Sequence, residues 1–221
     1  MLVNEITNTE ISPLKLTDTV SAAMLRLDLL HSTQIAVVDE DDQLVGMASL
    51  AKLVEVVDDQ SLLSEVELST PVSVPDYQHL FEASRVMLAH ELYLLPVVDV
   101  NRQFLGMVKK RDVLTALGDV FNLSSYGSVI TVELSQKDFA LSDLVRIIEM
   151  EGAKILGVAV QQPRAHNPSY SVSFKLNMED SSVVSSSLRR FGYTITSEAD
   201  SEMLEHNFSD RADELIRYLD I

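Results

Sequence analysis

Two stretches of the chain share the same order of apolar and polar positions. The apolar run Leu94–Val98 is followed by a polar turn at 99–102 and by a second apolar run, Phe104–Val108. The same order occurs sixty residues earlier, between Ile35 and Ala48. Short apolar runs joined by a polar turn predict strand, tight turn and strand.

Several positions in these stretches are identical at the sixty-residue offset. They are Val37/Val97, Val38/Val98, Asp39/Asp99, Gln43/Gln103, Gly46/Gly106 and Met47/Met107. Similarity at a fixed offset over this length indicates two copies of one supersecondary unit. One unit alone exposes an apolar sheet face, so we expect the copies to pack against each other about a pseudo-twofold axis. We also expect Gly106 to let another group approach the backbone closely.

Helices are expected around each strand pair. Residues 1–13 indicate a short lead-in helix and turn, and Thr17-Asp18-Thr19 offers capping side chains to an amphipathic helix that follows. Another helix is expected from Ser49 to about Val57. Its counterpart in the second copy is expected from Arg111 to about Leu117, ended by Gly118.

The pattern changes at Asn122–Gly127, which we interpret as a linker. The following residues predict strand, helix, strand, strand, helix and strand, with clean alternation in Tyr170–Leu176. This order predicts a four-stranded antiparallel sheet with two helices on one face. Ser209 and Asp210 cap a last amphipathic helix, Arg211–Leu219. The expected domains are 1–62, 63–121 and 128–200, followed by a C-terminal helix within 201–221.

The composition is that of an ordinary soluble globular protein, with 46% hydrophobic residues and a mean hydropathy of +0.11. The absence of cysteine excludes disulfides, a thiol nucleophile and Cys-ligated metals, and is consistent with a reducing cytosol. The N-terminus lacks the pattern of a signal peptide, and no segment reaches the about 18 apolar residues that a membrane helix needs. We therefore expect a cytoplasmic protein without a membrane partner.

The net charge is −17, and more than half of it falls in residues 1–70. Most of this surface would repel nucleic acid, which we do not expect as a partner. The one basic cluster is Lys109-Lys110-Arg111, within the second copy of the repeat. Such a cluster at a helix start is often only a solvated face, and that interpretation stays open.

No pattern in the sequence indicates an enzyme. The histidines show no metal-ligand spacing among themselves: they are His31, His79, His90, His166 and His206. The acidic run Asp39–Asp42 is explained by a hairpin turn, and it has no calcium-loop spacing. A P-loop, a dinucleotide glycine fingerprint and a nucleophile elbow are all missing. We expect no catalytic residue, no metal site and no required cofactor.

The duplicated unit resembles the CBS domain, and the tandem resembles a CBS pair (Bateman module). The resemblance is carried by Leu95–Asp99 and Phe104–Asp112 in copy two and by Ile35–Asp39 and Leu44–Lys52 in copy one. The C-terminal part resembles an ACT domain, and the combination is similar to acetoin-utilisation-like CBS–ACT proteins. The implied fold class is α+β, with two CBS-type repeats in a pseudo-twofold pair plus a C-terminal βαββαβ ferredoxin-like (ACT-like) domain.

The resemblance implies a regulatory homodimer that senses an adenosine-containing ligand such as AMP, ATP or S-adenosylmethionine. In the family pattern Gly-x-x-Ser/Thr-x-x-Asp, the aspartate holds the ribose hydroxyls and the hydroxyl residue helps to hold phosphate. Copy two keeps the glycine and Asp112 but has Lys109 at the hydroxyl position. Copy one keeps the glycine and Ser49 but has Lys52 in place of the aspartate. Neither pattern is complete.

We predict one ligand site in copy two, where Lys109 pairs with phosphate as a point charge. The predicted ligand-binding residues are Asp112, Lys109, Pro96, Leu94 and Val74, together with Ser49 of copy one. The alternative is that Asp112 is simply a carboxylate at a helix N-terminus. In the ACT-like part, Gln136 and Phe139 stand where the family often has Asp-x-x-Gly, so we interpret that domain mainly as a pairing surface.

Two hypotheses remain at this stage. In the first, the chain is a non-catalytic sensor that binds an adenine nucleotide in the CBS pair and assembles through both domains. In the second, it is a dimeric interaction scaffold with degenerate nucleotide sites and a protein partner that is unknown. The choice of nucleotide, and whether copy one or the ACT-like domain binds a ligand, stay open.

Overall fold

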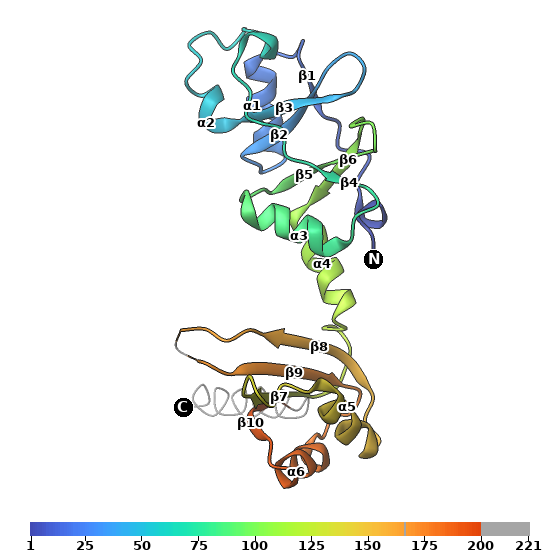
Figure 1. Cartoon of the computed structure of the whole chain (residues 1–221). Coiled ribbons are helices and arrows are strands. Elements are labelled where there is room, and N and C mark those ends of the chain that lie inside the picture. The colour runs from blue at the N-terminus through green and yellow to red at the C-terminus, as the bar shows by residue number, and fades with distance from the viewer. Residues whose placement is uncertain (166, 200–221) are drawn as a thin grey trace, which may run out of the picture. The chain divides into compact units, whose positions relative to one another are not determined.

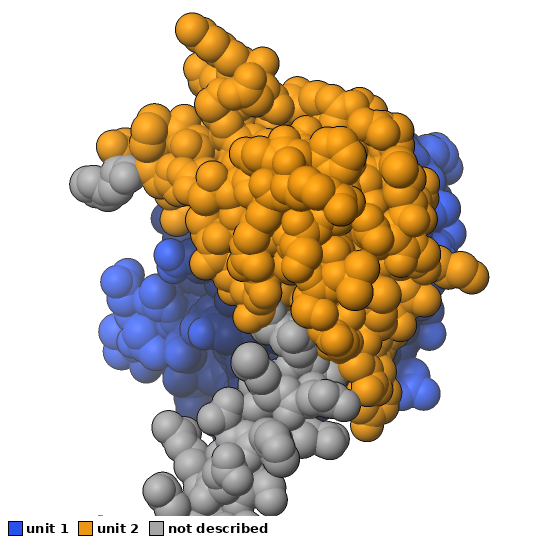
Figure 2. All heavy atoms as spheres, turned by 90° about the horizontal axis from the view of Figure 1, so that it is seen from below, with its two compact units in different colours: residues 1–117 blue, residues 118–221 orange. Residues whose placement is uncertain are grey.

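The computed structural model describes residues 1–165 and 167–199 (Figure 1). The chain divides into two compact units, Met1–Leu117 and Gly118–Ile221, which Figure 2 shows in different colours. Among the described residues, no helix is long and apolar enough to cross a membrane. The expected helix Arg211–Leu219 lies outside the described residues. The finer domain borders expected from the sequence stay a prediction.

The first unit contains two three-stranded sheets of the same design. Their strands are β1 (Leu14–Lys15), β2 (Gln34–Val38) and β3 (Leu44–Ser49), and β4 (Val74–Pro75), β5 (Leu94–Val98) and β6 (Phe104–Lys109). In each sheet the middle strand is parallel to the first and antiparallel to the third. Each strand of the second sheet begins sixty residues after its counterpart, and both hairpins have a register shift at the same position. The predicted duplication is therefore confirmed in the backbone.

The helices recur at the same spacing. They are α1 (Val20–Leu29), α2 (Leu50–Leu53), α3 (Leu80–Ala89) and α4 (Lys110–Val120). Thr19 caps α1 as predicted, because its hydroxyl accepts the N–H of Ala22 at 3.2 Å. The helix α2 stops well before the predicted end near Val57. Valines follow at three of the next four positions, and β-branched residues lose side-chain freedom in a helix.

The prediction that Gly118 ends the last helix of this unit is wrong, since α4 continues to Val120. A glycine ends a helix where it takes the left-handed conformation. Gly118 does not take it, because it is not among the described residues with positive φ. Asn122, with φ +52°, takes that conformation instead. The N–H of Leu123 then donates to the carbonyl of Gly118 at 2.8 Å and closes the helix end.

Each repeat is completed by the segment that precedes the other repeat. We call β1 to α2 repeat one and β4 to α4 repeat two. Residues 1–8, the N-terminal strap, lie on repeat two, and residues 62–69, the inter-repeat strap, lie on repeat one. Each strap contains one short 3-10 helix, η1 (Val3–Ile6) or η2 (Leu63–Glu65). The helix expected within residues 1–13 is therefore limited to η1, and it has a counterpart sixty residues later.

Main-chain hydrogen bonds hold the N-terminal strap on repeat two. The N–H of Asn8 donates to the carbonyl of Met107 at 2.8 Å, and the N–H of Met107 donates to the carbonyl of Asn8 at 3.0 Å. A Cβ added at Gly106 would lie only 2.7 Å from the carbonyl oxygen of Asn8. The predicted close approach at Gly106 is thus confirmed, and the approaching group is the N-terminal strap.

The inter-repeat strap makes the same contacts on repeat one. Ser69 and Met47 exchange two main-chain hydrogen bonds of 2.8 and 3.0 Å. A Cβ added at Gly46 would lie 2.8 Å from the Cβ of Leu68. The glycine that the two copies share therefore serves the same purpose in both: it makes room for a strap.

The two repeats also share a hydrophobic core. Leu94, Val98 and Met107 of repeat two pack with the buried residues of repeat one. The two hairpin turns meet through a bridge between Gln43 and Gln103. These contacts confirm the expectation that the apolar sheet faces of the two copies cover each other.

The second unit has the predicted order of elements. They are β7 (Val129–Leu134), α5 (Leu141–Met150), β8 (Ile155–Gln161), β9 (Tyr170–Leu176), α6 (Ser182–Arg190) and β10 (Thr194–Ala199). The sheet order is β10-β7-β9-β8, and all its pairs are antiparallel. Alternate residues of β7 and β9 are buried and form one core with α5 and α6. The four-stranded antiparallel sheet with helices on one face is confirmed.

Candidate functional site

The β6–α4 junction of repeat two holds the residues predicted to bind a ligand. The turn between β5 and β6 is fixed by Asp99, whose Oδ1 accepts the N–H groups of Asn101 and Gln103, both at 2.8 Å. The chain then passes from β6 directly into α4 at Lys110, whose N–H donates to the carbonyl of Tyr93 at 2.9 Å. The end of β6 and the first turn of α4 are therefore held beside the start of β5.

Four of the predicted residues lie around this junction. Leu94, the first residue of β5, pairs with Lys109, the last residue of β6. Asp112 lies in the first turn of α4. Pro96 follows in β5, where it is buried opposite Met107.

Val74 and Ser49 lie apart from these four residues. Val74 pairs with Val97, which is three residues along β5 from Leu94, or about 10 Å at about 3.3 Å per residue. Ser49 belongs to repeat one, where its hydroxyl accepts the N–H of Lys52 at 3.4 Å and caps α2. The structure thus gives Ser49 a capping role, and its contact with a ligand stays a prediction.

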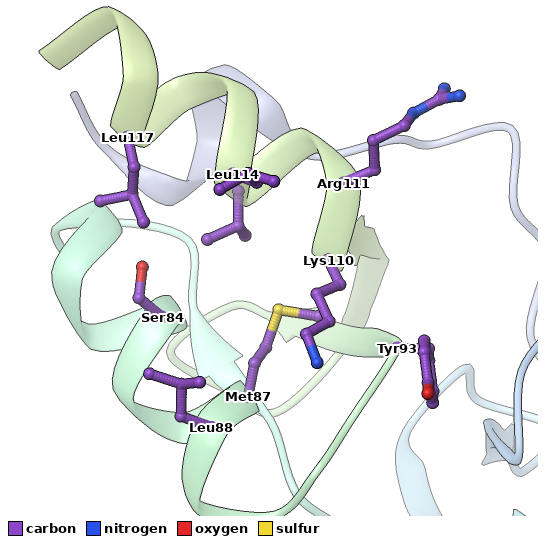
Figure 3. Close-up of a pocket in the computed structure, with 9 residues that line it drawn as sticks. Ser84, Met87, Leu88, Tyr93, Lys110, Arg111, Leu114 and Leu117 are labelled. Atoms are coloured by element: carbon purple, nitrogen blue, oxygen red, sulfur yellow. The ribbon is translucent and has the colours of Figure 1, made fainter. Parts of the chain in front are cut away.

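The Asp112 carboxylate is accessible to a ligand. Its side chain is 33% exposed, and its Oδ1 lies 3.8 Å from Nε of Arg111, whose own side chain is 83% exposed. A pair this exposed contributes about 0–1 kcal/mol, so it does not compete strongly with a ligand. Nearby, Nζ of Lys110 lies 5.2 Å from the centre of the Tyr93 ring, and Figure 3 shows both side chains.

A polar hollow of about 580 Å³ opens next to the junction, where the starts of β2 and β5 meet. It is lined by Thr33, Gln34, Met87, Leu88, His90, Glu91, Tyr93 and Lys110. None of the six predicted residues is in this lining, although Tyr93 and Lys110 directly adjoin Leu94 and Lys109 in the sequence. The hollow could not be predicted from the sequence, because it forms only where the two repeats meet.

A second, apolar hollow of about 430 Å³ lies between α3 and α4 (Figure 3). Met87 and Leu88 line it from α3, and Leu114 and Leu117 line it from α4. Leu88 is 72% exposed and Leu114 is 69% exposed. Its chemistry suits an apolar surface rather than a charged small molecule.

The equivalent junction of repeat one is arranged differently. Lys52, at the position of Asp112, donates from Nζ to Oε1 of Glu67 at 2.6 Å and to the carbonyl of Leu68 at 3.3 Å. The hydrogen bond and charge of Lys52 lower the pKa of Glu67 below its usual value. The junction of repeat one is therefore tied to the inter-repeat strap.

Comparison with known families identifies the second repeat. Residues 63–119 match the CBS domain. The matched residues include β5, β6 and nearly all of α4, which together form the β6–α4 junction. The CBS resemblance is therefore confirmed for repeat two. Repeat one has the same elements and strand register sixty residues earlier.

Several solved structures are similar to about half of this chain. The CBS domains of a transcriptional regulator from Streptococcus pneumoniae show 23% identity and a TM-score of 0.47, over 52% of this chain and 98% of that one. A CBS domain pair/ACT domain protein from Thermotoga maritima shows 24% identity and a TM-score of 0.49, over 54% and 98%. CBSX2, solved in complex with AMP, shows 21% identity and a TM-score of 0.46, over 54% and 97%.

The second unit has a polar hollow of its own, about 460 Å³ in volume, at the ends of β7 and β10. Glu133, Asp138 and Ser169 are among its lining residues. Phe139 stands at the position where the ACT pattern has glycine. The centroid of its ring lies 4.4 Å from the ring centroid of Tyr170. The loop after β7 is thus closed by an aromatic contact where a glycine would leave space, and the ACT-like assignment stays a prediction.

Within the described residues, no group of three or more His, Cys, Asp or Glu side chains could hold a metal ion. The acidic turn at Asp39 is explained by the backbone, as expected: its Oδ1 accepts the N–H groups of Asp41 and Gln43 at 3.0 and 2.9 Å. The two straps are structural elements that could not be predicted from the sequence. The repeated glycine predicted that some group would approach, but not which one.

Proposed function

We propose that this chain is a non-catalytic regulatory protein whose CBS pair senses one adenosine-containing ligand: AMP, ATP or S-adenosylmethionine. The observation that carries the proposal is the partly exposed Asp112 carboxylate in the first turn of α4, which directly follows Lys109 at the end of β6, within the stretch that matches the CBS domain. CBS domains typically regulate other activities rather than catalyse reactions, which supports a sensor.

The chemistry of the junction suits a ribose and an anionic group. A carboxylate accepts hydrogen bonds from both ribose hydroxyls. The Lys109 ammonium pairs with a phosphate or carboxylate of the ligand, and the polar hollow beside it adds the ammonium of Lys110 and the amide of Gln34. The backbone of Leu94 and Pro96 is left to recognise the adenine. In this proposal Val74 makes an apolar contact, and Ser49 approaches from repeat one.

Thermal unfolding of the full chain tests the sensor. The panel contains AMP, ADP, ATP, NAD, S-adenosylmethionine and several amino acids. A ligand at 100 times its dissociation constant adds about 2.7 kcal/mol, which raises the Tm of a chain this size by about 5–10 °C. We expect one adenosine compound to give this shift and Asp112→Ala to weaken its binding by at least about fivefold. An unchanged affinity in Asp112→Ala would remove the proposed role of this carboxylate.

We further propose that the chain is a cytoplasmic homodimer that assembles through its CBS and ACT-like domains. The apolar hollow between α3 and α4, with exposed Leu88 and Leu114, supports an assembly surface there. Light scattering of the wild type and of Leu114→Glu tests this part. A dimer that becomes monomeric in the variant supports it, and a monomeric wild type contradicts it.

The alternative function is a ligand-free dimeric scaffold that engages another protein. It is favoured by the incomplete ligand pattern in both copies and by the same exposed leucines. The thermal panel separates the two functions. A dimer that shows no shift with any compound would make the scaffold the better description.

A further inference from the structure

The lysine that replaces the ligand-binding aspartate in repeat one is already engaged. Lys52 lies sixty residues before Asp112, and its side chain is 34% exposed. Its ammonium contacts Glu67 at 2.6 Å and the carbonyl of Leu68 at 3.3 Å. Both acceptors belong to the inter-repeat strap, so the side chain of Lys52 spans the space between α2 and that strap.

Repeat two does not close the same space. Asp112 is shorter than a lysine, and its ion pair is with Arg111 on its own helix. Thr7 of the N-terminal strap stands at the position of Glu67. The two repeats share their registers and strap contacts, yet among the described residues the side chain of Asp112 makes no hydrogen bond or ion pair with the N-terminal strap.

The surroundings of Lys52 also disfavour an anionic ligand. The hollow of about 300 Å³ beside it has three carboxylates in its lining: Glu55, Glu65 and Glu67. Repeat two has threonine in place of two of them: Thr115 and Thr7. Repeat one also has the uncharged run Ser49–Ala51 where repeat two has Lys109–Arg111. A phosphate would therefore meet less positive charge in repeat one, and its local concentration there would be lower.

We propose that Lys52 closes the ligand site of repeat one, so that the chain binds a single adenosine-type ligand although it carries two repeats. The inference rests on the function proposed above. An ammonium donates hydrogen bonds but accepts none, so Lys52 offers no acceptor to the ribose hydroxyls. A ligand would also have to displace the contact between Lys52 and Glu67. Lys52 is in this sense a specificity-determining residue.

The test converts repeat one into a copy of repeat two. The triple variant Lys52→Asp, Glu55→Thr, Glu67→Thr places the residues of repeat two at these three positions. Calorimetric titration of the full chain with AMP then counts the sites. We expect one site in the wild type, the same site at least about fivefold weaker in Asp112→Ala, two sites in the triple variant, and one unweakened and one weakened site in the triple variant that also carries Asp112→Ala. Glu67→Thr alone is the matched control and should keep one site, because Lys52 remains.

The outcomes separate this inference from the proposed function. Two sites in the wild type would overturn the closure by Lys52 without any need for the triple variant to fold. A folded triple variant that binds only as many molecules of AMP as the wild type would overturn it as well. A wild type without any site, together with one site in the triple variant, would contradict AMP as the ligand of repeat two and still support the closure.

Discussion

Replacing Gly106 by alanine tests how the N-terminal strap is held. The new Cβ would lie 2.7 Å from the carbonyl oxygen of Asn8 and 2.8 Å from Cγ2 of Thr7, so the strap would have to move away from β6. The two main-chain hydrogen bonds between Asn8 and Met107 would then be lost. At about 0.5–1.5 kcal/mol each, their loss should lower the free energy of unfolding by about 1–3 kcal/mol.

Hydrogen exchange and urea unfolding together measure this effect. The amides of Asn8 and Met107 should lose protection in Gly106→Ala. The matched control is Gly118→Ala, which makes the same change inside α4, where a Cβ would meet nothing within 4 Å. That control should stabilise the chain by about 0.5–1 kcal/mol through helix propensity. Unchanged protection at both amides, with an unfolding free energy within about 0.5 kcal/mol of the wild type, would refute the reasoning.

Three further substitutions test other parts of the structure. Lys52 lowers the pKa of Glu67 from its ordinary value of 4.5, so the charged form stabilises the fold above that pH and this contribution is lost as the pH falls through the lowered value. The difference in Tm between the wild type and Glu67→Gln should therefore shrink on acidification, and a difference that grows would contradict the pair. Phe174 is fully buried in the core of the second unit, so Phe174→Ala should lower the free energy of unfolding by about 3–5 kcal/mol. Hydrogen-exchange protection should be lost in the described residues from 118 to 199 but kept in β5 and β6. Thr19→Ala should lower the free energy of unfolding in urea by about 1 kcal/mol, because the helix cap is lost. The control is Thr115→Ala, which should have almost no effect, because the exposed hydroxyl of Thr115 contacts only its own helix. Equal effects of the two substitutions would argue against the cap.

The hairpins, the duplication and the second unit could be predicted from the sequence because their determinants are local. Alternation over a few residues defines a strand, and the side chain of Asp99 fixes its turn through the N–H groups of Asn101 and Gln103. Because the same pattern recurs sixty residues later, the same strands and turn are expected twice. Prediction was weaker at helix ends: α4 passes through Gly118, because a glycine ends a helix only when its backbone turns left-handed.

The arrangement of the candidate site was only partly predictable. The motif placed Lys109 and Asp112 at one junction with Leu94, as the structure shows. Val74 was predicted as part of the same site, but it pairs with Val97, three residues along β5 from Leu94. The polar hollow beside the junction depends on residues of both repeats, such as Gln34 and Tyr93, and no local pattern connects them.

The sequence by itself determined that this protein has two copies of one strand–helix unit, a separate antiparallel α+β unit, and an incomplete ligand motif in each copy. Only the tertiary structure decided that each copy is completed by the strap of the other, and that Lys52 is bound to Glu67. The physical reason is that a main-chain hydrogen bond leaves no mark on the identity of its residues. A glycine shows that space is needed, and a lysine shows that a charge is present, but the group that fills the space or pairs with the charge is chosen only when distant segments pack together.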